Sequence, residues 1–130
     1  MGPWHTAKLW DDGHHEEALA AAGSAVFDVY LPAKVEMPKG SKPDAMIGKA
    51  FGGAGSPFLE IPGFEEAGQD RTNAYQGTQH LGLACAKLVR NLATHNVTVK
   101  RDENEILEEL AMLSRFARIV VASRSRTSQS

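Results

Sequence analysis

Residues 70–94 have the sequence DRTNAYQGTQHLGLACAKLVRNLAT, and this stretch decides the fold class. Apolar side chains recur through it at i, i+4, i+7 and i+11, and these are Leu81, Cys85, Leu88 and Leu92. This spacing predicts one long helix with a buried stripe. Gly77 and Gly82 cost helix propensity, so we expect another helix to pack closely at their level.

Further helices are predicted on both sides of this stretch. Alanines and valines at helical spacing after Asp11-Asp12-Gly13 predict a helix over 11–31, with an aspartate as its N-cap and Pro32 as its end. A kinked continuation to Met37 is the alternative. A short helix fits residues 44–51. Asp102 predicts the N-cap of a last helix. Its buried stripe is expected to consist of Ile106, Leu110, Leu113, Ala117 and Val120, helped by Leu107, Phe116 and Val121.

The rest of the chain is predicted to be irregular. Glycine and proline punctuate residues 38–64 densely, and no segment is a convincing strand. The fold class expected is therefore all-α, an antiparallel up-and-down helical bundle with three long helices, one short helix and a long irregular loop. We expect residues 1–10 to form an irregular lead-in, 11–123 the helical domain, and 124–130 a disordered polar tail.

Composition sets limits on function. The chain has 130 residues, 42% of them hydrophobic, and a formal net charge of −2. This balance argues against binding RNA over many phosphates. Cys85 is the single cysteine, which excludes an internal disulfide framework and a multi-cysteine zinc site and favours a cytoplasmic location. No apolar run in the sequence approaches the roughly 20 residues that cross a bilayer, so no membrane association is expected.

The chemistry that the sequence offers lies at the end of the long helix. Arg90-Asn91 is followed by His95. Histidine moves protons near neutral pH, and arginine stabilises a crowded phosphate, so the residues suit metal-free RNA cleavage. By spacing alone the motif is weak, because about 0.8 matches are expected by chance in this composition. Capping of the helix C-terminus by the same side chains is the alternative interpretation.

Helix geometry restricts how the motif could act. In an unbroken α-helix Arg90 and His95 point about 140° apart. Joint action therefore requires the helix to end or bend before His95, or a second subunit to supply one partner.

Four blocks in order, from about Trp10 to Ser123, carry a resemblance to a known family. They are Asp12-Gly13-His14 with Glu17-Ala18, Met46-Ile47-Gly48-Lys49-Ala50-Phe51-Gly52 with Pro57-Phe58-Leu59, Gln76-Gly77 to Arg90-Asn91 with His95, and Leu110-Ala111-Met112-Leu113-Ser114-Arg115-Phe116. On these blocks the chain resembles the Ymh-type family of prokaryotic and phage hypothetical proteins, which is similar to the HEPN superfamily of helical domains. Leu92 stands where that family has proline, and Thr94 where it has a small residue.

The resemblance implies a homodimeric HEPN-like domain over 11–123, with the motif in a cleft between subunits. It implies a metal-independent endoribonuclease of toxin or phage-defence type, without a cofactor and with RNA and an antitoxin protein as partners. Its catalytic residues would be Arg90, Asn91 and His95. Substrate-binding residues would be Lys87, Thr94 and Arg101. The alternative function is a non-catalytic helical interaction or nucleotide-binding module, possibly of phage origin.

Overall fold

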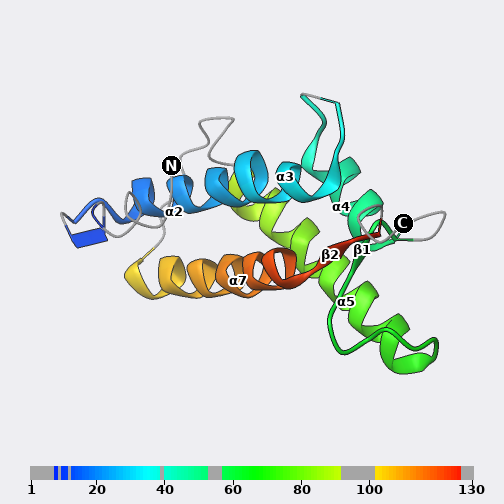
Figure 1. Cartoon of the computed structure of the whole chain (residues 1–130). Coiled ribbons are helices and arrows are strands. Elements are labelled where there is room, and N and C mark those ends of the chain that lie inside the picture. The colour runs from blue at the N-terminus through cyan, green and yellow to red at the C-terminus, as the bar shows by residue number, and fades with distance from the viewer. Residues whose placement is uncertain are drawn as a thin grey trace.

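The computed structural model describes residues 8, 10, 11, 13–38, 40–52, 57–91 and 102–126, with only the backbone of Asn91. These residues are mostly helical, which confirms the all-α prediction (Figure 1). The helices are α2 (His15–Ser24), the π-helical segment η1 (Ala25–Tyr30), α3 (Leu31–Val35), α4 (Pro43–Phe51), α5 (Gln69–Cys85), the π-helical segment η2 (Ala86–Asn91) and α7 (Glu103–Ala122). The strands are β1 (Leu59–Glu60) and β2 (Arg124–Ser125).

Helices α2, η1 and α3 form one continuous helix of 21 residues. It extends past Pro32 to Val35, so the helix continues beyond the proline, as in the alternative prediction, and does not end there. The N–H of Leu31 bonds to the carbonyl of Val26, five residues back, so the hydrogen-bond ladder shifts just before proline, which has no N–H to donate. The predicted aspartate cap is wrong, because the helix begins at His15 with His14 as N-cap and no side-chain cap bond.

By length and composition alone, the same continuous helix is long and apolar enough to cross a membrane, with a mean hydropathy of 1.2 over its most apolar 18 residues. Half of that window is buried inside the fold. The buried side chains include Leu19, Phe27 and Leu31, each at most 1% exposed. Packing against the other helices is therefore sufficient to account for the apolar character of this helix.

The predicted short helix α4 and the predicted N-cap of α7 are confirmed, whereas Leu107 and Val121 of α7 are exposed and not buried as expected. The apolar face of α4 is buried as expected. Asp102 caps α7 through a reciprocal pair of bonds: its Oδ1 accepts the N–H of Glu105 at 2.8 Å, and its own N–H donates to Glu105 Oε1 at 3.1 Å. Such a capping box satisfies two N–H groups that the first helical turn leaves without partners.

The first helix and α7 lie side by side and run in the same direction, while α5 crosses behind them (Figure 1). At their C-terminal ends, Lys34 Nζ donates to the carbonyls of Val121 at 3.0 Å and Ser123 at 2.8 Å. In the centre Phe27 stacks on Phe116, with ring centroids 5.8 Å apart. These contacts join helices that are far apart in sequence around one core.

A two-stranded antiparallel sheet departs from the expectation of no strand. Leu59 pairs with Ser125 and Glu60 with Arg124, and the N–H of Arg126 extends the contact to the carbonyl of Phe58 at 2.9 Å. Two-residue strands are too short to show an alternating sequence pattern, so the pairing is invisible before folding. Residues 124–126, which begin the stretch predicted as a disordered tail, are held by this pairing.

Candidate functional site

The motif residue Arg90 lies on η2, where the long helix changes from α to π geometry. Of the two large apolar residues of this turn, Val89 is buried, at 2% exposure, whereas Leu88 is 51% exposed. The predicted stripe through Leu88 is therefore wrong at this position. Each π-helical hydrogen bond spans one residue more than an α-helical bond. The residue that follows Cys85 on the buried face is therefore Val89 and not Leu88.

Arg90 is anchored on the first helix by an ion pair. Its Nη2 lies 3.1 Å from Oδ1 of Asp28, and its side chain is 23% exposed. The two helices approach closely here, because a Cβ added at Gly23 would lie 3.3 Å from Cγ1 of Val89 and 3.9 Å from Cα of Arg90. The ion pair thus connects the two π-helical segments, η1 and η2, at a tightly packed crossing.

Lys87, predicted to bind substrate, lies one turn before Arg90. Its Nζ pairs with Oδ2 of Asp44 on α4 at 3.1 Å, and both side chains are exposed. Each of these two cations therefore has a carboxylate partner from another helix. A phosphate that binds here competes with two carboxylates, which lowers the positive potential of the surface.

The other predicted site residues are not placed. His95, Thr94 and Arg101 lie outside the described residues, and of Asn91 only the backbone is described. The angle of 140° assumes an α-helix throughout, and the helix has already left α geometry at Ala86.

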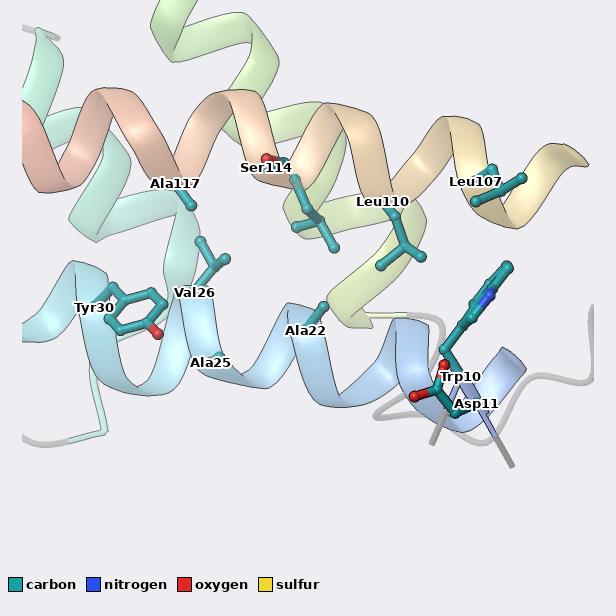
Figure 2. Close-up of a pocket in the computed structure, with 11 residues that line it drawn as sticks. Trp10, Asp11, Ala22, Ala25, Val26, Tyr30, Leu107, Leu110, Ser114 and Ala117 are labelled. Carbon is teal, nitrogen blue, oxygen red and sulfur yellow. The ribbon is translucent and has the colours of Figure 1, made fainter. Parts of the chain in front are cut away.

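A second feature of the surface is an apolar groove of about 550 Å³ between the first helix and α7 (Figure 2). Helical spacing predicts that Leu107 and Val121 are buried, whereas they are 46% and 57% exposed, so the groove is not predictable from the sequence. The lining residues come from the N-terminal segment, α2, η1 and α7, and they are Trp10, Asp11, Ala22, Ala25, Val26, Tyr30, Leu107, Leu110, Leu113, Ser114 and Ala117.

Metal-ligating side chains do not gather within the part of the chain that the structure describes, where no group of three His, Cys, Asp or Glu could hold an ion. His14 and Glu17 approach to 3.9 Å but are exposed. His15 stacks on Trp10 with ring centroids 3.8 Å apart. These two histidines therefore serve local packing and helix-start contacts.

Comparison with known proteins identifies one family. A family model described as a protein of unknown function (Hypoth_ymh) matches residues 4–120, most of the chain. No curated protein and no solved structure matches the chain significantly. The match spans both the surface around Arg90 and the apolar groove.

Proposed function

Since the chain belongs to the Hypoth_ymh family of unknown function, we propose from its motif and the geometry around Arg90 that it is a metal-independent endoribonuclease. We place it in the HEPN superfamily of up-and-down helical bundles, acting in the cytoplasm in phage defence or as a toxin. A homodimer and an antitoxin protein belong to the same proposal. The family description by itself carries no activity.

The proposed reaction is attack of a ribose 2′-OH on the adjacent phosphorus. The 2′ O–P bond forms and the P–O5′ bond breaks, leaving a 2′,3′-cyclic phosphate and a 5′-OH. His95 takes the proton of the 2′-OH or returns one to the leaving oxygen. Arg90 stabilises the charge on the non-bridging oxygens, and Asn91 orients His95 or the phosphate. Neighbouring phosphates are bound by Lys87, Thr94 and Arg101.

The observation that carries this proposal is the placement of Arg90. Asp28 restricts the rotamers of a side chain that is still partly exposed at the end of the helix. Less conformational entropy is then lost when a phosphate engages the guanidinium, which is the advantage of a preorganised site.

The test is RNA cleavage in EDTA, because EDTA suppresses contaminating metal-dependent nucleases. The wild type should yield cyclic-phosphate ends, and His95→Ala and Arg90→Ala should each lose activity by about 100-fold or more, the usual range for a proton-transfer or charge-stabilising group. Arg115→Ala, an exposed arginine on α7, is the matched control and should retain full activity. Equal cleavage by all variants, or none by the wild type, would overturn the proposal.

A non-catalytic helical interaction module is the second candidate function. The apolar groove between the first helix and α7 favours it, since apolar side chains line a groove that is open to solvent and could take the apolar face of a partner segment. Absence of cleavage by the wild type together with a stable protein complex would select this function.

A further inference from the structure

A hollow of about 400 Å³ lies between the C-terminal end of α4 and the first turns of α5. Its volume is in the range of small-ligand pockets, and it shares no lining residue with the apolar groove. The lining residues that matter below are Gly52, Pro57, Arg71, Tyr75, Gln76 and Gln79. We propose that this hollow binds an unpaired adenine base of the RNA strand, as a specificity subsite of the proposed ribonuclease, on which this inference rests.

The charge of the chain decides which part of an RNA the protein can hold. The formal net charge is −2, and both Lys87 and Arg90 are paired with carboxylates. Attraction to phosphates is therefore weak, and an RNA substrate must gain affinity and specificity from contacts to its bases. Proteins recognise unpaired bases by stacking them on aromatic or guanidinium planes and by hydrogen bonds to their edges.

Arg71 and Tyr75 supply the stacking surface. The guanidinium carbon of Arg71 lies 4.4 Å from the centroid of the Tyr75 ring. Nη1 of Arg71 also donates to the carbonyl of Phe64 at 2.6 Å. These two contacts fix the guanidinium while its side chain still lines the hollow. A planar group that is held in this way stacks on a base with little further loss of conformational entropy.

Gln76 and Gln79 supply the hydrogen bonds. They lie three residues apart on one side of α5, and both line the hollow. Neither side-chain amide makes a hydrogen bond within the described residues, whereas Gln69 on the same helix donates to Oδ1 of Asn73 at 2.8 Å. Each amide offers a donor beside an acceptor, and adenine presents the matching pair, its N6 amino group beside a ring nitrogen, on two edges. Two glutamines therefore favour adenine over uracil.

Gly52 keeps the amide of Gln79 accessible. It ends the block Met46–Gly52, which is one of the four blocks that carry the family resemblance. Its φ is +148°, a conformation that favours glycine, and an added Cβ would lie 3.2 Å from Oε1 of Gln79. The block thus contributes a glycine to the proposed subsite, at a position where a side chain would crowd the base-reading group.

The subsite lies within reach of the surface around Arg90. Lys87 pairs with Asp44 in the first turn of α4, and Gln79 meets Gly52 at the other end of that helix. Gln79 and Lys87 are eight residues apart, about 12 Å along the axis of α5. Stacked nucleotides rise about 3.4 Å each, so a strand of a few nucleotides spans this distance.

The first experiment measures binding of fluorescent RNA hexamers by anisotropy. The hexamers contain only adenine or only uracil, and each 2′ oxygen is methylated so that the proposed cleavage cannot occur. The wild type should bind the adenine hexamer about tenfold more tightly, as expected for one good two-bond contact to a base. Gln76→Ala and Gln79→Ala should each remove most of this ratio and leave binding of the uracil hexamer unchanged. Gln69→Ala is the matched control on the same helix and should keep the ratio.

Equal affinity of the wild type for the two hexamers would overturn the subsite, as would a lack of binding to either. A ratio that survives in both Gln76→Ala and Gln79→Ala would also overturn it. Circular dichroism checks that each variant is folded. Failure of the proposed ribonuclease is a separate outcome, because it is an absence of cleavage and not a loss of base preference.

The second experiment maps cleavage sites in a uridine-rich RNA that contains one adenosine. The wild type should cut preferentially at a fixed position within a few nucleotides of the adenosine. Gln79→Ala should cut without this preference, at the same rate as the wild type on an RNA of uridine alone. Cleavage by the wild type that ignores the adenosine would overturn the subsite and leave the proposed ribonuclease standing.

Discussion

Arg90 lies 3.1 Å from Asp28, a residue 62 positions earlier in the chain. The pair joins η2 to η1, so the arginine that the motif singles out is held by a partner that the motif does not contain. At the same distance Lys87 pairs with Asp44. In the proposed RNA cleavage Arg90 acts on the reacting phosphate, whereas Lys87 only binds substrate. Substitutions of their partners, Asp28 and Asp44, can therefore be compared directly.

Asp28→Asn should lower RNA cleavage by about tenfold, because Arg90 loses its fixed orientation before the phosphate binds. Asp44→Asn should leave the rate constant kcat unchanged, since Lys87 contributes only to binding. Both substitutions should cost less than about 1 kcal/mol of unfolding free energy, as expected for exposed pairs. Single-turnover kinetics and urea denaturation supply the two readouts, and a rate loss shared by both variants would contradict the positioning role of Asp28.

Gly82→Ala should destabilise the fold by about 1–3 kcal/mol, because its Cβ would lie 2.5 Å from Cε1 of the buried Phe116. Gly77→Ala is the control on the same helix, where nothing lies within 4 Å of the added carbon. It should stabilise the helix by up to about 1 kcal/mol through propensity. Thermal unfolding of the two variants measures the difference, and equal midpoints would refute the close contact.

Tyr75→Phe should cost about 1–3 kcal/mol, because the hydroxyl accepts the buried N–H of Ile61 at 3.0 Å and donates to the carbonyl of Leu59 at 3.3 Å. Without it a buried N–H loses its partner. Tyr30→Phe, on the wall of the groove, is the control and should change stability by less than about 0.5 kcal/mol. Urea denaturation separates the two, and a neutral Tyr75→Phe would contradict this role in holding β1.

Cys85 should resist thiol reagents at neutral pH in the folded protein. Burial, with a smaller contribution from the carboxylate of Glu109, raises the pKa of this thiol from 9.0 to about 11. The thiolate is the reactive form, so labelling should require unfolding. Leu107→Cys, at an exposed position, should label quickly, and fast labelling of Cys85 in the wild type would contradict its burial.

The same pKa shift predicts a pH dependence of stability. Its contribution is fully present below pH 9 and is lost as the pH rises toward 11, because the unfolded thiol ionises first. Cys85→Ala should remove this loss. Urea denaturation of both proteins at pH 8 and pH 10.5 measures it.

The candidate site was only partly predictable from the sequence. Arg90 is predictable as a site residue because it belongs to a short motif that can be read from neighbouring residues. Asp28 carries no signal of its own, since nothing in the chain around it marks a partner 62 residues away. The groove was missed for a related reason: helical spacing shows which residues share a face, but it does not show how much of that face the neighbouring helix covers.

By itself, the sequence determined the helical class, the short helix α4 and the capping box at Asp102, because caps, breakers and apolar spacing act within a few residues. Only the tertiary structure decided how closely each helix approaches its neighbours and how much of its apolar face they cover. In the π-helical turn Val89 is buried and Leu88 is exposed. The ring of Phe116 packs against Gly82 and not against Gly77, and β1 pairs with β2. Each of these depends on the shape of a distant segment, which acts only once the chain has folded.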